Sequence, residues 1–134
     1  MHQNLRPAVD LALQQDVVPV LRASGFTGTL PHFRRRRREH IDLLTFQFDR
    51  GGGGFIIEIG RCGPTGVRTY FGEDVPANKV TAHDLHPDKR HRIQAAPGSG
   101  TDSWFRYDRD GVPGCIAQAL AKLPEAEAWW AACV

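Results

Sequence analysis

Apolar residues recur at every fourth position near the start of the chain. They form the series Leu5, Val9, Leu13, Val17 and Leu21. This spacing places them on one face of an amphipathic helix, so the pattern predicts a helix over residues 5–24. Gly25 follows at the place where a left-handed residue often ends a helix. Pro19 lies inside the series and lacks a backbone N–H group, so we expect the helix to kink or restart near Asp16.

Two later segments alternate between apolar and polar positions, as half-buried strands do. In residues 41–49 one face carries Leu44, Phe46 and Phe48, and residues 55–61 repeat the alternation. The tetraglycine at 51–54 lies between them, and glycine supplies the positive backbone angles of tight turns. It lacks the Lys-Ser/Thr ending of a phosphate-binding loop. These segments therefore predict an antiparallel hairpin.

The rest of the chain completes an α+β pattern. Residues 31–36, 90–95 and 103–108 have strand character, a helix is expected from Pro113, and Pro124 opens a last helical segment. We therefore predict a single α+β domain over residues 1–134. Its antiparallel sheet has about four or five strands, with the N-terminal and C-terminal helices packed on one face.

Composition and length agree with one domain of a soluble globular protein. The chain has 134 residues, of which 41% are hydrophobic and 24% are charged. No apolar run approaches the roughly 20 residues that span a bilayer, and Asp10 and Asp16 interrupt any signal-peptide centre. We therefore expect a cytoplasmic protein without a membrane segment. The three cysteines are odd in number and widely spaced, which favours free thiols.

Charge is concentrated in one pentapeptide, Arg34 to Arg38. The formal net charge is +2, and these five arginines contribute +5, which leaves −3 for the rest of the chain. Phe33 is expected to end one strand and Ile41 to begin the next, so the arginines should lie at a solvated hairpin tip. Such a tip can protect a sheet edge from aggregation, or it can bind a partner.

A protein partner is favoured over nucleic acid as the ligand of this tip. Nucleic-acid-binding domains usually spread basic residues over a face and interleave aromatic rings. Here the nearby rings of Phe46, Phe48 and Phe55 are expected in the core. On the opposite sheet face Glu58 would repel phosphate. A nucleic-acid-binding module using Arg34 to Arg38 remains an alternative.

The sequence contains no catalytic constellation above background, so we predict no catalytic residue, metal ligand or cofactor. His83, His86 and His91 form the best metal candidate. Pro87 interrupts any helix that would present the first two together. A small metal-dependent hydrolase therefore remains a further alternative, which requires that these histidines and a carboxylate converge.

Two adjacent tryptophans, Trp129 and Trp130, lie near the end of the chain. Neighbouring residues of a helix point about 100° apart, so one ring should lie in the core and the other should be partly exposed. We take Trp130 as a candidate contact residue.

Several short segments are together characteristic of one bacterial family. They are LRASGF, HFRR, LLTFQF, GFIIEIG, RHRI and DSWF. In this arrangement the chain resembles the domain of unknown function 4304 family over about residues 5–130. The resemblance implies a small α+β domain with no established activity to transfer, and it draws attention to Arg34, Gln47 and Arg92. The long arginine run and the tetraglycine depart from the family pattern.

We expect a non-enzymatic protein-binding module, of an inhibitor or immunity type. Its candidate binding residues are Arg34, Arg35, Arg36, Arg37, Arg38, Gln47, Glu58, Arg92 and Trp130.

Overall fold

A computed structural model describes residues 4–69, 71–95 and 103–133 of the chain. The N-terminal helix is present in three parts: α1 (Arg6–Ala12), a π-helical turn (Leu13–Val17) and α2 (Val18–Ala23). The predicted interruption before Pro19 therefore takes the form of a widened turn. Gly25 follows the helix with φ +98°, as expected for the residue after a helix end.

Six of the described strands form the main antiparallel sheet. They are β1 (Thr27–Thr29), β2 (His32–Arg36), β3 (Ile41–Phe48), β4 (Gly54–Cys62), β7 (Arg90–Ile93) and β8 (Phe105–Arg106). Their order is β1-β2-β3-β4-β7, and β8 also pairs with β4. The hairpin of β3 and β4 is confirmed, with Phe48 opposite Phe55 and Ile41 opposite Cys62. The α+β class is confirmed, and the described sheet has six strands rather than four or five.

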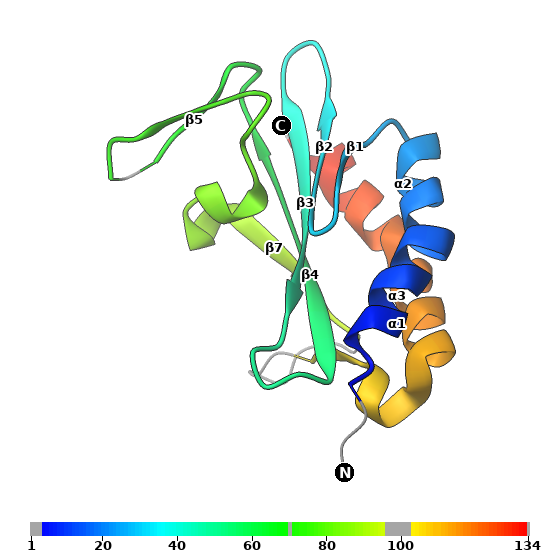
Figure 1. Ribbon diagram of the computed structural model, residues 1–134. Coiled ribbons are helices and arrows are strands. Elements are labelled where there is room, and N and C mark those ends of the chain that lie inside the picture. The colour runs from blue at the N-terminus through cyan, green and yellow to red at the C-terminus, as the bar shows by residue number, and fades with distance from the viewer. Residues whose placement is uncertain (1–3, 70, 96–102, 134) are drawn as a thin grey trace.

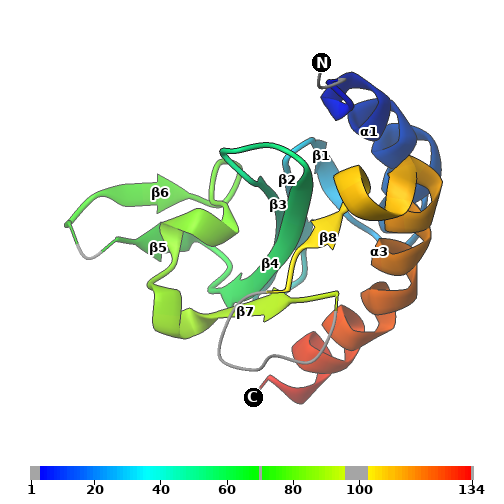
Figure 2. The same cartoon turned by 90° about the horizontal axis from the view of Figure 1, so that it is seen from below.

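One face of the sheet is covered by the helices. The N-terminal helix and α3 (Tyr107–Ala132) lie side by side on this face in both views (Figures 1 and 2). The largest fully buried side chains of this layer are Phe26, Phe33, Phe46, Phe55, Phe105, Leu13, Leu44, Ile57 and Ile59. Those in β3 and β4 occupy the alternate strand positions that the sequence pattern assigned to the core.

The opposite face is covered toward one end by described residues of the segment after β4. The segment after β4 forms a two-stranded arm, β5 (Gly66–Arg68) and β6 (Asp74–Pro76). Two 3-10 turns follow, η2 (Ala82–Asp84) and η3 (Pro87–Lys89). A second, smaller core joins this cover to the sheet, with the buried residues Ile41, Leu43, Val80, Ala82 and Leu85. The sequence pattern did not predict this layer.

Two expectations near the C-terminus are wrong. The strand expected over residues 103–108 is only β8, because the helix α3 already begins at Tyr107. The second expectation is that Pro124 opens a separate helical segment, whereas α3 continues through Pro124. The helix is instead broken by a kink at the non-helical residue Gly111, φ +77°, so a helix resumes close to Pro113 as expected. A proline removes one helical hydrogen bond, but tertiary packing supplies most helix stability in proteins. The buried face of α3 therefore maintains the helix past Pro124.

Candidate functional site

The five arginines do not share one environment. Strand β2 extends to Arg36, so the run lies partly in the sheet and not wholly at a solvated tip as expected. Side chains alternate between the two faces of a strand. Arg34 and Arg36 therefore lie on one face, and Arg35 lies on the helix-covered face with Phe33. Arg34 donates its Nε hydrogen to the carbonyl of Val80, at 3.0 Å.

Arg35 is buried, with 6% of its surface exposed. Its guanidinium donates to Asp42 at 3.0 Å, to both carboxylate oxygens of Glu127 at 2.9 and 3.0 Å, and to the Ser24 carbonyl. It also lies over the ring of Phe26. Desolvation opposes its charge, but the hydrogen bonds to Glu127 and Asp42 prevail and raise the pKa of Arg35. The Arg35 side chain therefore connects β2 to β3 and to α3 through hydrogen bonds.

Asp42 is fully buried and is shared by three arginines. One carboxylate oxygen accepts from Arg35 and Arg37, and the other accepts from Arg61 at 3.0 Å. We call Arg35, Arg37, Asp42 and Arg61 the Asp42 cluster. His40 Nε2 lies 3.6 Å from the same carboxylate, and a cleft of about 360 Å³ borders the cluster. With Glu127 included, three guanidinium groups face two carboxylates, so one positive charge remains in excess.

The exposed members of the arginine run are the three at the β2–β3 turn. Arg36 and Arg38 are exposed, and their side chains make no hydrogen bond or ion pair with any residue that the structure describes. Arg37 uses its Nε hydrogen on Asp42, and its side chain is 49% exposed. We call Arg36, Arg37 and Arg38 the arginine tip. Among the predicted binding residues, the arginine tip presents guanidinium N–H groups that no described residue accepts.

Three other predicted residues meet on the opposite face of the sheet. Glu58 is 1% exposed and accepts from Arg90 at 3.2 Å and from Arg92 at 3.0 Å. Arg92 also lies within 3.4 Å of the Gln47 side-chain oxygen. Because two arginines compensate Glu58, this network is internally paired, and it orders the strands β3, β4 and β7.

The structure places Trp130 in the core and not at the surface. Its ring is 2% exposed, packs 5.2 Å from that of Phe26, and donates its indole N–H to the Gly60 carbonyl at 2.9 Å. Trp129 is partly exposed and stacks on His91. The expectation of one core ring and one partly exposed ring is confirmed, but the surface role assigned to Trp130 does not fit its position.

The three histidines of the metal hypothesis each contact a different residue. His83 meets the ring of His32, His86 is paired with Asp88, and His91 is within 3.4 Å of Glu125. Within residues 4–69, 71–95 and 103–133, no group of three or more His, Cys, Asp or Glu side chains is placed to hold a metal ion. The metal-dependent hydrolase alternative therefore has no ligand set among these residues.

Cys62 and Cys115 do not have the lowered pKa of an activated nucleophile. Burial raises the pKa of the Cys62 thiol to about 11 and that of Cys115 to about 12. A nucleophilic thiol needs a lowered pKa, because the thiolate is the reactive form. The described helices also include none that is long and apolar enough to cross a membrane.

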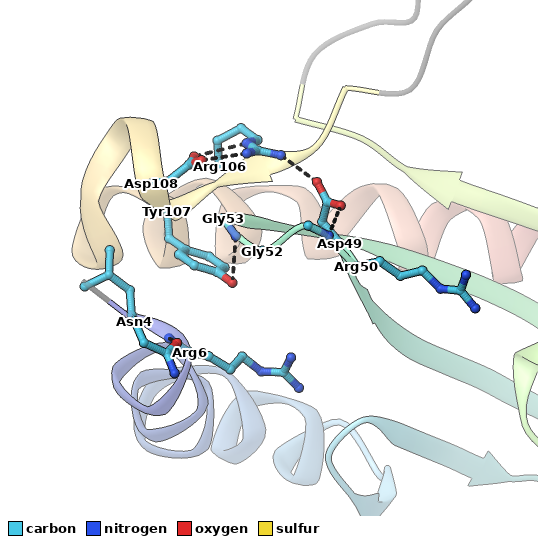
Figure 3. Close-up of a pocket in the computed structure, with 11 residues that line it drawn as sticks. Asn4, Arg6, Asp49, Arg50, Gly52, Gly53, Arg106, Tyr107 and Asp108 are labelled. Atoms are coloured by element: carbon cyan, nitrogen blue, oxygen red, sulfur yellow. Dashed lines mark hydrogen bonds and ion pairs between the residues drawn. The ribbon is translucent and has the colours of Figure 1, made fainter. Parts of the chain in front are cut away.

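A polar cavity of about 660 Å³ lies at the turn between β3 and β4. The tetraglycine forms this turn as predicted, with φ +86° at Gly52 and +89° at Gly53. Tyr107, at the start of α3, accepts the Gly53 N–H through its hydroxyl at 3.2 Å (Figure 3). Sequence reasoning missed this cavity because its walls come from three segments far apart in the chain.

The family model of the domain of unknown function DUF4304 matches the chain over residues 17–132. The chain belongs to the DUF4304 family. The family resemblance noted from the sequence is therefore confirmed. No curated protein and no solved structure matches the chain.

The DUF4304 match contains most of the features described above. It begins in the π-helical turn and ends at the last residue of α3, so the arginine tip, the Asp42 cluster and Tyr107 all lie inside it. Arg6, at the start of α1, lies before it. The family description assigns no activity, so the function must be argued from the geometry.

Proposed function

We propose that this DUF4304 domain is a non-enzymatic protein-binding module, of an inhibitor or immunity type, that recognises an acidic surface of its partner through the arginine tip. The observation that carries the proposal is the exposure of Arg36 and Arg38 without any partner among the described residues. Arginine is enriched at protein interfaces, where its planar fork binds carboxylates in a bidentate way.

The Asp42 cluster supports this proposal by fixing the base of the tip. Arg35 is anchored on Asp42 and Glu127, and Arg37 is held by Asp42. The buried carboxylate of Asp42 is thus already bound by Arg35, Arg37 and Arg61. The side chains of the tip therefore extend from an ordered base with their charge available, which lowers the ordering cost of binding.

An exposed aromatic ring offers an apolar contact beside the arginine tip. Phe71, in the connection between β5 and β6, is 80% exposed. Figure 1 shows this arm projecting at the same end of the sheet as the β2–β3 turn. Arginine and aromatic side chains together are typical of the residues that dominate binding energy at protein interfaces. A partner that covers both features would have an acidic patch beside an apolar one.

The test is a fluorescence-anisotropy titration with two kinds of labelled probe. One is a peptide of about ten glutamates, and the other is a mixed-sequence RNA or DNA oligomer, each at about 50 mM and about 200 mM salt. The variant R36S/R38S removes two charges from the arginine tip. The matched control K89S/R109S removes two exposed charges elsewhere.

We expect peptide binding by the wild type and by the control, and its loss in R36S/R38S. Salt-steep binding of the oligomer alone, lost in the same variant, would instead identify a nucleic-acid-binding module. Binding of neither probe, or equal loss in both variants, would contradict a recognition role for the arginine tip.

A further inference from the structure

The cavity at the β3–β4 turn lies at the opposite end of β3 from the arginine tip. Its walls come from Asn4 to Arg6 before and in α1, from Asp49 to Gly53 in the turn, and from Arg106 to Asp108 at the start of α3. Ligand-binding cavities commonly have volumes of about 300–1,000 Å³, and this one has about 660 Å³. It therefore has the size of a small-molecule site.

Tyr107 directs a fixed hydroxyl group toward this space. Its side chain is buried, with 4% exposure, so the ring has little freedom. The hydroxyl oxygen accepts the Gly53 N–H, and its own hydrogen has no acceptor among the described residues. Figure 3 shows the hydroxyl between the glycine turn and the start of α1. A ligand acceptor atom would satisfy this donor.

Two arginines bring further unused donors to the cavity. Arg50 is exposed and has no hydrogen bond or ion pair with the residues of the described ranges. The guanidinium of Arg6 stacks on Phe48, with its central carbon 3.4 Å from the ring centroid. Its Nε hydrogen is donated to Asp10. Its terminal nitrogens remain free to donate. A flat, supported guanidinium suits the bidentate binding of a carboxylate or phosphate.

The two aspartates of the cavity are already engaged by Arg106. Asp49 accepts from Arg106 at 2.9 Å, and Asp108 accepts at 2.6 Å. The Gly51 N–H chiefly lowers the pKa of Asp49, and Arg106 chiefly lowers that of Asp108. With Asp10 on Arg6, three arginines face three aspartates, so the formal charges balance. Each of these carboxylates is already engaged, whereas guanidinium N–H groups of Arg6 and Arg50 are not, which favours an anion over a cation.

The glycine turn allows this arrangement. A side chain at Gly53 would collide with the side chains of Arg106 and Asp108, and φ at this residue is +89°. Glycine therefore lets Arg106 lie across the turn and occupy both aspartates. This gives the tetraglycine a role in the cavity beyond closing the hairpin.

We propose that this cavity binds a small organic anion, a phosphate monoester or a carboxylate, whose charged group is held by Arg6 and the Tyr107 hydroxyl. The exposed Arg50 stands at the rim, with its side chain drawn away from Tyr107 in Figure 3, and can turn toward the bound group. The cavity exceeds the size of the charged group alone, so the organic part of the ligand occupies the remaining space. The proposal is independent of the arginine tip, because the two sites share no residue and lie at opposite ends of β3.

Three probes of similar shape test the charge requirement. They are phenyl phosphate, benzoate and the neutral benzamide, titrated into the full chain at constant ionic strength. Amide NMR signals report the site, and calorimetry reports the affinity. We expect one or both anions to shift the signals of Gly51, Gly52, Gly53 and Tyr107, while benzamide does not. The comparison of phenyl phosphate with benzoate identifies the charged group.

Substitutions in the cavity test the named contacts. R50Q is chosen first because Arg50 is exposed and the fold does not depend on it, and R6Q and Y107F follow. Each is expected to weaken anion binding by about tenfold, the usual effect of losing one charge-assisted hydrogen bond. The control R109Q, outside the cavity, and R36S/R38S, at the arginine tip, should leave the affinity unchanged.

Two results would overturn the proposal. One is the absence of shifts at the glycine turn with either anion at concentrations of about 20 mM, well above the millimolar range of weak ligands. The other is equal weakening by R50Q and R109Q, which would show adventitious attraction to surface charge. If R36S/R38S binds the anion as tightly as the wild type does, the cavity acts separately from the arginine tip. A failure of one proposal can then be told from a failure of the other.

Discussion

Replacing Asp42 with asparagine removes the carboxylate that Arg35, Arg37 and Arg61 share. The side chain of Asp42 is 0% exposed and that of Arg35 is 7% exposed. Removing one partner of a buried ion pair typically costs about 3–5 kcal/mol, because the other charge stays buried without compensation. Arg35 retains Glu127, and the two other arginines can turn toward water. We therefore expect the lower end of this range, a loss of about 3 kcal/mol from the free energy of unfolding.

The measurement is urea unfolding followed by tryptophan fluorescence, since the ring of Trp130 lies 5.1 Å from the Arg35 guanidinium. A loss of about 3 kcal/mol is large beside the total of about 5–15 kcal/mol for a typical domain, and it corresponds to about 10 °C in Tm. The control D74N breaks the exposed pair of Asp74 with Arg68 and should change nothing measurable. A loss below about 1 kcal/mol in D42N would refute the view that Asp42 holds the arginine run in place.

Three further outcomes are expected. Arg35→Ser should lose about 3 kcal/mol of unfolding free energy, whereas R36S/R38S should change it by less than about 0.5 kcal/mol, as parallel urea titrations would show. Trp130→Phe leaves a β4 carbonyl without its indole donor and should cost about 1–2 kcal/mol in thermal unfolding. The Cys62 thiol, with its pKa raised from 9.0 to about 11, should react with Ellman's reagent at pH 8 about 100-fold more slowly than in the unfolded chain. Because the folded pKa is the higher one, the associated stability is present below about pH 9 and is lost as pH rises through about 11.

The strands β3 and β4 could be predicted because burial enforces their alternation. Leu44 and Phe46 face the helices, while Leu43 and Thr45 face the other layer, and a shift of one residue would exchange the two sets. The start of α3 could not be found in this way. Phe105 and Tyr107 are both buried and lie two residues apart, which is the spacing of one strand face. The chain nevertheless enters a helix between them, so the pattern wrongly predicted a continuing strand.

The sequence contains a pattern that indicates the burial of Arg35. Phe33 is an apolar residue at the expected end of a strand, and the residue two positions later in a strand points to the same side. Extending that alternation by one step places Arg35 inside, and the β3 register then places Asp42 directly opposite it. The cavity at the glycine turn left no comparable signal, because Arg6, Arg50 and Tyr107 are brought together only by the packing of α1 and α3.

The division of the arginine run determines how its function has to be tested. Replacing all five arginines would remove Arg35 from the Asp42 cluster, and lost binding would then be indistinguishable from a loosened fold. Arg37 is unsuitable for the same reason, since it also contacts the buried carboxylate. Arg36 and Arg38 have no such contact with the described residues. A change in binding caused by R36S/R38S therefore measures recognition at the surface, provided that the urea midpoint of this variant equals that of the wild type.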